Sequence, residues 1–228
     1  MNKRAIVSVA TGQFYMKMQD RLIETFSKCV DNITLIYNDR TAEWDTGKTL
    51  GIDLICWRDI LPPGSRSHKE SPYGFKVHAM KYAYEKGYTS VLWLDSPAYS
   101  IKEDVSPIFT KMEENGYYVM SHVDPLEYSV GEKCLSHFGA SRDNLKGFNL
   151  PSGSCYGFSN KFLFDSLFEF EILGLFTNEQ FCIDDIWRHH RHDEAVIALI
   201  LMFIGVPVFL DDPLFQSDSP ACCIKSGE

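Results

Sequence analysis

Residues 91–95 read Val-Leu-Trp-Leu-Asp, an apolar run that ends on a carboxylate. Patterns typical of helices lie on either side of this run, over 72–86 and 104–115. A buried strand between two helices is typical of an open α/β sheet, in which ligands bind outside the carboxyl ends of the strands. We therefore expect Asp95 to face whatever this protein binds.

The first 121 residues continue this alternation of strands and helices. Short β-branched runs predict strands at 5–10, 33–37, 52–57, 90–94 and 117–121. The helix after the first strand should bury one face, formed by Tyr15, Met18, Leu22, Phe26 and Cys29. Ser71 and Pro72 are the residue types of an N-cap and a first helical position. The alternation predicts a parallel, right-handed sheet covered by helices on both faces.

The regular pattern fails after residue 121. Residues 122–150 contain several glycines and few periodic positions, so we expect a long irregular loop there. The remaining expected elements are a strand at 155–158, a helix at 161–173, a polar connector at 177–192, a buried helix at 193–204 and a strand at 206–210. Taken together, residues 1–228 are expected to form one α/β domain with a mostly parallel central sheet and helices on both faces.

The composition narrows the classes of protein to which this chain can belong. With 45% apolar residues among 228, the chain can bury a full core. A formal charge of −9 without a basic run disfavours a nucleic-acid partner and suits a small ligand or saccharide better. Seven scattered cysteines without a C-x-x-C pair predict reduced, buried thiols and a cytoplasmic location. The apolar stretch near the amino terminus is too short for a signal sequence, and the run at 195–205 is too short to span a bilayer.

Three familiar ligand motifs are poor matches. Residues 42–49 fit a permissive phosphate-binding loop, but alanine replaces its first glycine and two acidic residues would face the phosphates. A polar surface loop is the simpler interpretation. Residues 9–13 lack the second and third glycines of a dinucleotide fingerprint. His189, His190 and His192 suggest a zinc site, but no further Cys or His lies at the spacing that zinc ligands require.

A better candidate for a ligand site is residues 71–76, Ser-Pro-Tyr-Gly-Phe-Lys. The amino end of a helix offers free N–H groups and the positive end of the helix dipole, and Lys76 adds a full charge. Together these groups suit a diphosphate. The alternative is that Ser71 only caps the helix while Lys76 is solvated. The nearby Asp95 favours the ligand site.

Gly-Phe-Lys at 74–76, an amphipathic helix, and Val-Leu-Trp-Leu-Asp-Ser at 91–96 together resemble the core of nucleotide-sugar-dependent glycosyltransferases of the GT-A fold. In that family a strand delivers an Asp-x-Asp motif, which holds a divalent cation that bridges the donor diphosphate. His-Asp-Glu at 192–194 is similar to the place where the family often has an acidic pair near the acceptor. The resemblance implies that residues 1–121 are the nucleotide-sugar-binding half and residues 122–228 the acceptor-side half.

The resemblance also implies a function, the transfer of a sugar from a nucleotide-diphosphate-sugar donor to a hydroxyl of a saccharide or glycan acceptor. The residues it assigns to the nucleotide sugar are Ala10, Thr11, Gly12, Asp39, Lys76, Asp95 and Ser96. Asp193 or Glu194 would then be the general base for the acceptor hydroxyl, or would support an oxocarbenium-like centre. An acidic pair also stabilises a first helical turn whatever its function. Asp184 and Asp185 compete for the catalytic role.

One position departs from the family pattern. The motif reads Asp95-Ser96-Pro97, so its second carboxylate is missing. Asp95 could still hold Mn²⁺ or Mg²⁺ as a metal ligand, together with donor phosphates and water. Lys76 and helix dipoles could instead take the place of the cation. The third alternative is a catalytically inactive module of the same fold that only binds nucleotide sugars.

Overall fold

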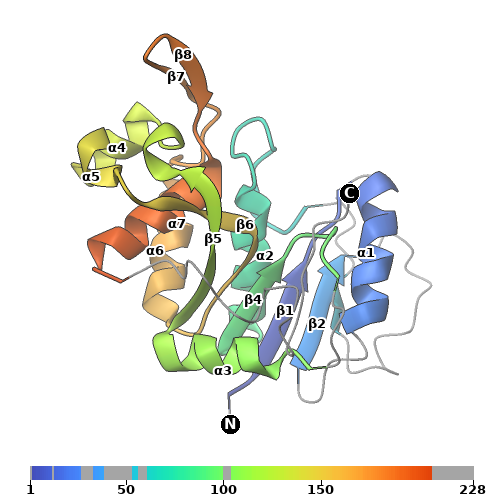
Figure 1. The fold of residues 1–228 in the computed structure, drawn as a ribbon. Helices are drawn as coiled ribbons and strands as arrows, with labels where there is room; N and C mark the ends of the chain where they lie inside the picture. The colour runs from blue at the N-terminus through green and yellow to red at the C-terminus, as the bar shows by residue number, and fades with distance from the viewer. Residues whose placement is uncertain are drawn as a thin grey trace.

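The computed structural model describes residues 2–11, 13–26, 33–38, 53–55, 61–99 and 104–206. A six-stranded sheet forms the centre of this part of the chain, in the strand order β3-β2-β1-β4-β6-β5 (Figure 1). Its strands are β1 (Arg4–Ser8), β2 (Ile33–Asn38), β3 (Asp53–Ile55), β4 (Ser90–Leu94), β5 (Tyr117–Pro125) and β6 (Asn149–Phe158).

Helices cover both faces of the sheet, as predicted. The larger helices are α1 (Gln13–Phe26), α2 (Gly74–Glu85), α3 (Ser106–Asn115), α6 (Lys161–Ile172) and α7 (His192–Phe203). Side chains alternate along each strand, so Leu92 and Leu94 pack with α1 and α3, while Val91 and Trp93 pack with α2, α6 and α7. Both faces of β4 are therefore buried, which explains its continuous apolar run.

The sheet is mostly parallel, as predicted, but one strand from the second half of the chain runs antiparallel to its neighbours. β1 pairs in parallel with β2 and β4, and β2 pairs in parallel with β3. However, β6 lies antiparallel between β4 and β5, so β4 and β5 are not neighbours. The carboxyl ends of β1 and β4 therefore share one edge of the sheet, with the first half of β6 beside them.

The segment 122–150 is more regular than the predicted loop. Gly131 and Gly139 bound a helix here, and Gly139 has a φ of 61°, the left-handed C-cap conformation that glycine adopts readily. Glycine in this segment thus marks helix ends. After the last residues of β5, the elements of this segment are a 3-10 turn (Leu126–Tyr128), α4 (Glu132–Phe138) and α5 (Arg142–Leu145), which lead into β6.

The predicted polar connector 177–192 contains a hairpin that extends away from the sheet (Figure 1). Its strands β7 (Gln180–Ile183) and β8 (Ile186–His189) pair antiparallel. Asp184 and Asp185 form the two-residue turn with φ values of 49° and 62°, as a type I′ turn requires. Both are exposed and neither lines the cavities described below. The turn therefore explains why these two aspartates occupy this position.

Three further expectations have mixed outcomes. Cys134 and Cys155 are buried free thiols as expected, whereas Cys182 is exposed on β7. Within the described ranges, no helix combines the length and apolar character that crossing a bilayer demands. The strand predicted at 206–210 lies, beyond its first residue, outside the described residues.

Candidate active site

Helix α2 does not start in the way that the sequence predicts. Its N-cap is Tyr73, which has a φ of 60°. The Ser71 hydroxyl instead donates a hydrogen bond to Glu171 of α6 at 2.6 Å. The prediction that Ser71 caps the helix and Pro72 opens it is therefore wrong, because a buried carboxylate from the second half of the chain binds the hydroxyl.

Glu171 is fully buried and holds the segment before α2 in place. Its Oε1 also accepts a hydrogen bond from Arg66 Nη2 at 2.8 Å, and its Oε2 lies 3.0 Å from His78 Nε2. Burial alone would raise the pKa of Glu171, but the bonds from His78, Ser71 and Arg66 lower it to about 2. The carboxylate is thus ionised at neutral pH and ties the start of α2 to α6.

Lys76, one turn into α2, is buried rather than solvated. Its Nζ donates to the Gly153 carbonyl at 2.8 Å and lies 3.0 Å from Asp95 Oδ1 and 3.3 Å from Asp193 Oδ2. The Gly153 carbonyl thus accepts a hydrogen bond from the ammonium, and the two carboxylates are its ion-pair partners. Burial disfavours the charge, but Asp193 and Asp95 raise the pKa of Lys76 above its ordinary value. Lys76 therefore joins α2, β4, β6 and α7 as a permanent cation.

Asp95 lies at the carboxyl end of β4, where the sequence predicts it. Its Oδ1 accepts the indole N–H of Trp93 at 2.8 Å in addition to the contact with Lys76. Its backbone N–H donates to the Ser154 carbonyl at 3.0 Å, which fixes the strand end against β6. The Asp95 side chain is nevertheless 29% exposed. Asp95 is therefore the most exposed of the three residues Lys76, Asp95 and Asp193.

Asp193 and Glu194 lie in the first turn of α7, and their carboxylates have different surroundings. Asp193 is buried, and burial raises its pKa to about 6 although Lys76 acts in the opposite direction. Glu194 accepts the backbone N–H of Gly153 at 2.9 Å and pairs with Arg191 Nε at 2.9 Å. A Cβ atom on Gly153 would lie 2.8 Å from Glu194 Oε1, so the glycine permits this close approach.

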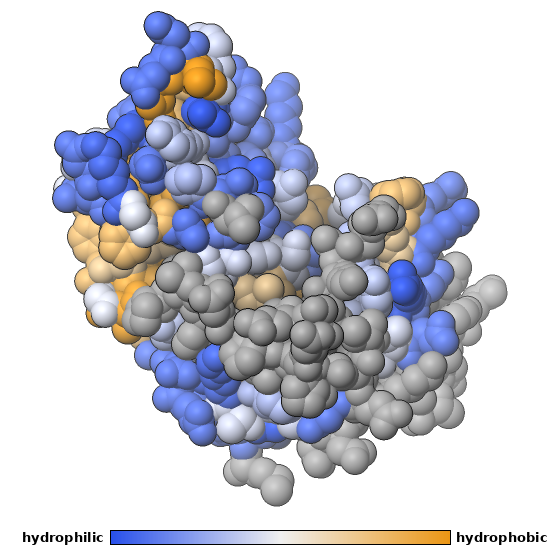
Figure 2. Space-filling model, in the orientation of Figure 1, coloured by the Kyte–Doolittle hydropathy of each residue, from blue (hydrophilic) through white to orange (hydrophobic). Residues whose placement is uncertain are grey.

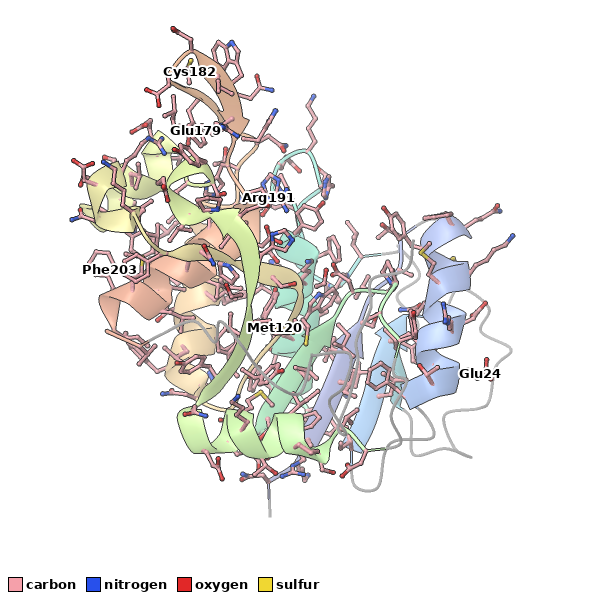
Figure 3. The ribbon with its side chains drawn as sticks, viewed as in Figure 1. Glu24, Met120, Glu179, Cys182, Arg191 and Phe203 are labelled. Atoms are coloured by element: carbon pink, nitrogen blue, oxygen red, sulfur yellow. The ribbon has the colours of Figure 1, made fainter. Side chains whose placement is uncertain are left out.

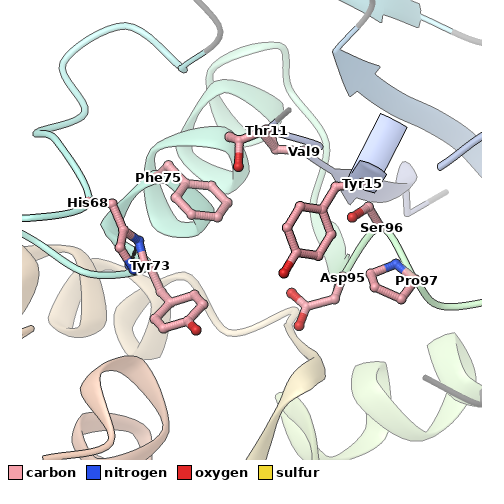
Figure 4. A pocket seen from close by; sticks show the side chains of 9 residues that line it. All are labelled: Val9, Thr11, Tyr15, His68, Tyr73, Phe75, Asp95, Ser96 and Pro97. Carbon is pink, nitrogen blue, oxygen red and sulfur yellow. Dashed lines mark hydrogen bonds between the residues drawn. The ribbon is translucent and has the colours of Figure 1, made fainter. Parts of the chain in front are cut away.

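Three cavities meet at Asp95. The largest, which we call the aromatic cavity, measures about 450 Å³ and lies between the first turn of α1 and the start of α2. Figure 4 shows Tyr15 on one side, Phe75, His68 and Tyr73 across from it, and Asp95 near the end of the Tyr15 side chain. The remaining lining residues are Val9, Thr11, Ser96 and Pro97.

The charged cavity, about 250 Å³, lies on the α7 side of Asp95. Its lining residues are Tyr73, Lys76, Asp95, Gly153, Ser154, Arg191, His192, Asp193 and Glu194. A third cavity, about 230 Å³, extends from Asp95 along β5 and β6 past Met120 and His122. The surface is hollowed between the side that carries the hairpin and α1, and Arg191 lies below the hairpin on that side (Figures 2 and 3).

The structure brings most of the predicted site residues together. Those that line the aromatic or the charged cavity are Thr11, Lys76, Asp95, Ser96, Asp193 and Glu194. Ala10 is buried beside Thr11 and lines neither cavity. Gly12 and Asp39 lie outside the described residues, so their assignment to the nucleotide stays a prediction.

The sequence did not reveal several residues of the site. The helical pattern predicts Tyr15 in the core, but it is 46% exposed and lines the aromatic cavity. Its position directly after the first strand could have indicated this, because the loops and helix starts at that edge surround the ligand. Tyr73 and His192 owe their places to positive φ values, which the sequence does not show. The sequence analysis likewise did not predict Arg191, Gly153, Ser154 or His68 as site residues.

The described residues fit a divalent cation poorly. One oxygen of Asp95 is already shared by Trp93 and Lys76, and Pro97 offers no side-chain ligand. Among the residues with described positions, no group of three or more His, Cys, Asp and Glu side chains is arranged to hold a metal ion, and this includes the histidines 189, 190 and 192. A cation held by Asp95 with donor phosphates stays a prediction.

Comparison with solved structures identifies the architecture. Mouse xyloside xylosyltransferase 1 in its apo form superposes with a TM-score of 0.53 over 93% of this chain and 86% of its own, at 11% identity. The fold is that of a GT-A-like glycosyltransferase. GlyE from Streptococcus pneumoniae TIGR4 matches 95% of this chain at 16% identity with a TM-score of 0.53. The bifunctional glycosyltransferase WbbM matches 93% at 10% identity with a TM-score of 0.51.

These similarities concern the fold alone. This chain covers 47% of the GlyE chain and 39% of the WbbM chain, so it spans less than half of either. No family model matches the sequence, and no curated protein matches it. Because one fold supports many activities, function has to be argued from the cavities and the charged cluster of the GT-A-like domain.

Proposed function

We propose that this GT-A-like domain is a glycosyltransferase that moves a sugar from a nucleotide-diphosphate-sugar donor to a hydroxyl of a saccharide or glycan acceptor. The observation that carries the proposal is the junction at Asp95, where an aromatic cavity meets a cluster of ionised side chains at the carboxyl ends of β1 and β4. Ligands of open α/β sheets bind at this edge.

The aromatic cavity suits the nucleoside. Tyr15 faces Phe75 and Tyr73 across it, and aromatic side chains on both sides can stack on a planar base (Figure 4). Thr11 and Ser96 lie on its lining and provide hydroxyl groups for the ribose or the phosphates. A nucleoside in this cavity would direct its diphosphate and sugar toward Asp95.

Lys76 has a different role from the one that the sequence suggests. Its ammonium is already engaged by the Gly153 carbonyl and by two carboxylates, so we assign it to holding Asp95 and Asp193 in fixed positions. Its charge still attracts the diphosphate over a longer distance. Arg191, whose side chain is 49% exposed in the charged cavity, is better placed to contact phosphate oxygens directly.

Asp193 is the proposed general base. A carboxylate with a pKa of about 6 accepts a proton better than an ordinary one and is still ionised at neutral pH. In this reaction the acceptor hydroxyl gives its proton to Asp193 while its oxygen bonds to the anomeric carbon. The bond from that carbon to the diphosphate oxygen breaks, and the nucleoside diphosphate leaves.

A thermal-shift screen of uridine, guanosine and adenosine diphosphates and their sugar conjugates tests the proposal. A ligand that binds only the folded state raises the melting temperature. We expect a shift with at least one conjugate, together with release of nucleoside diphosphate in a turnover assay. Asp95→Asn should reduce turnover at least 100-fold, whereas Asp165→Asn on the exposed face of α6 should not change it.

The outcome also separates an enzyme from a binding module. The missing second carboxylate, at Pro97, favours the module, because the motif then lacks a metal ligand. A melting-temperature shift without turnover against any acceptor, with or without Mn²⁺, would support the module. Absence of binding to every nucleotide and conjugate would refute both.

A further inference from the structure

His192 and Tyr73 form an aromatic pair with strained backbones at the charged cavity. Tyr73 has a φ of 60° and His192 a φ of 48°, backbone angles that residues other than glycine rarely adopt. Their rings lie 5.3 Å apart between centroids, and the Tyr73 ring also lies 4.8 Å from Lys76 Nζ. Such conformations persist only where the surrounding structure enforces them, often at functional sites.

A single hydrogen bond sets the tautomer of His192. Its Nδ1 lies 2.8 Å from the Thr177 carbonyl oxygen, which can only accept, so Nδ1 carries the proton. Burial lowers the pKa of His192 to about 4, and nearby Arg191 and Lys76 act in the same direction, although the Thr177 carbonyl opposes them. At pH 7 the ring is neutral, and its Nε2 is a hydrogen-bond acceptor.

We propose that Nε2 of His192 accepts a hydrogen bond from a second hydroxyl of the acceptor, next to the one that attacks. The inference rests on the proposed function and makes His192 a residue that selects the acceptor. The attacking hydroxyl has one proton, which Asp193 takes, so the bond to His192 has to come from another hydroxyl of the same molecule. The acceptor is therefore a saccharide with neighbouring hydroxyls rather than the lone hydroxyl of a serine or threonine side chain.

The charged cavity supports this assignment of His192. Asp193 follows His192 directly in the chain, and both line the same cavity of about 250 Å³. The tilted contact with the Tyr73 ring, at an interplanar angle of 38°, and the bond to Thr177 hold the ring from two sides. A neutral nitrogen lone pair favours an O–H donor and disfavours a carboxylate or phosphate on the acceptor at this point.

Histidine ¹⁵N NMR and acceptor kinetics test the proposal on the whole chain. The probes are p-nitrophenyl glycosides of glucose, galactose and xylose, and a serine- and threonine-containing peptide, each added after saturation with the nucleotide sugar that binds best. The variants are His192→Phe, which keeps a ring beside Tyr73, and His192→Gly, which fits the positive φ. His189→Phe, on the exposed hairpin, is the matched control.

We expect the wild-type ring to be protonated at Nδ1 at pH 7, and at least one glycoside to move its Nε2 signal. Both His192 variants should raise the KM for that glycoside at least 10-fold and keep the KM for the donor and the hydrolysis of the donor by water. His189→Phe should behave as wild type. An Nε2-protonated ring, transfer to the peptide alone, or unchanged glycoside kinetics in both variants would overturn the inference. Failure of every nucleotide sugar to bind would refute the proposed function instead.

Discussion

At the scale of single residues, Lys76 determines the electrostatics of the site. It is a buried cation between two carboxylates, and both of its acidic partners lie within 3.3 Å of Nζ. Breaking such a pair leaves a buried charge without compensation, which is far more costly than losing an exposed salt bridge. The positions of Asp95 and Asp193 therefore depend on one side chain of α2.

We expect Lys76→Met to lower the free energy of unfolding by about 3–5 kcal/mol at pH 8, because Asp193 is then buried without its cation. The loss should be smaller at pH 5, where Asp193, with a pKa of about 6, is largely protonated. Urea denaturation at both pH values measures the difference. The control is Lys81→Met, which removes an exposed pair with Glu85 and should change stability by less than about 0.5 kcal/mol. Equal losses at both pH values would contradict this account.

The sequence was sufficient to place Asp95 but not to describe its environment. The rule that ligands bind at the carboxyl ends of strands requires only the apolar run and its flanking helices. The sequence also predicts that Lys76 lies near Asp95, and the 3.0 Å contact confirms it, whereas the contact of Lys76 with Asp193 depends on α7 from the far end of the chain. Local patterns predict that a residue faces a site. They do not predict which other groups it meets there.

At the scale of elements, β6 is the strand that the sequence could not place. Its apolar residues 155–158 predict a strand, but nothing local indicates that it inserts between β4 and β5. The insertion has consequences for the site, since it brings the carbonyl of Gly153 to Lys76 and its N–H to Glu194. The hairpin β7-β8 was missed for a different reason: its turn is Asp184-Asp185 rather than a sequence with glycine.

Gly157→Ala tests how tightly β6 is inserted. A Cβ atom at this position would lie 2.6 Å from the Val91 carbonyl oxygen and 2.7 Å from Met112 Sδ. The backbone of β4 cannot move aside cheaply, so we expect a loss of about 1–3 kcal/mol, as for other overpacked cores. Chemical denaturation measures this loss of stability. Gly87→Ala is not a suitable control, because Gly87 has a φ of 87° and alanine would be strained there. Ser166→Ala on the exposed face of α6 is suitable and should leave stability within about 0.5 kcal/mol.

At the scale of the whole molecule, the two halves of the chain meet at the candidate site. β4 and α2 come from the first half, while β6 and α7 come from the second, and the charged cavity is lined by both (Figure 1). Glu171 of α6 adds a second connection, through Ser71, Arg66 and His78. The halves predicted from the sequence are therefore joined through buried ionised groups, which makes the stability of the fold sensitive to pH.

His190, which is buried, and His192, which is half-buried, determine whether stability rises or falls with pH. Burial lowers the pKa of His190 and of His192 from 6.5 to about 4. Between pH 4 and pH 6.5 the unfolded chain binds protons that the folded protein excludes. The contribution of the two histidines to stability is therefore complete above pH 6.5 and is lost as the pH falls toward 4. Asp193 acts in the opposite direction, since its pKa rises from 3.8 to about 6 and its contribution is lost as the pH rises through 6.

Because two groups oppose one, we expect the free energy of unfolding to decrease by roughly 1 kcal/mol per pH unit between pH 6.5 and 4.5. Asp193→Asn removes the opposing group, so the decrease in that variant should become about twice as steep. Urea denaturation in this range gives both slopes, and Asp165→Asn, an exposed carboxylate on α6, should keep the wild-type slope. Glu171, with a pKa of about 2, contributes only below this range, because its stabilisation is lost below pH 4.5. A slope in Asp193→Asn equal to that of the wild type would mean that Asp193 is already ionised at pH 5, and its assignment as the general base with a raised pKa would then be wrong.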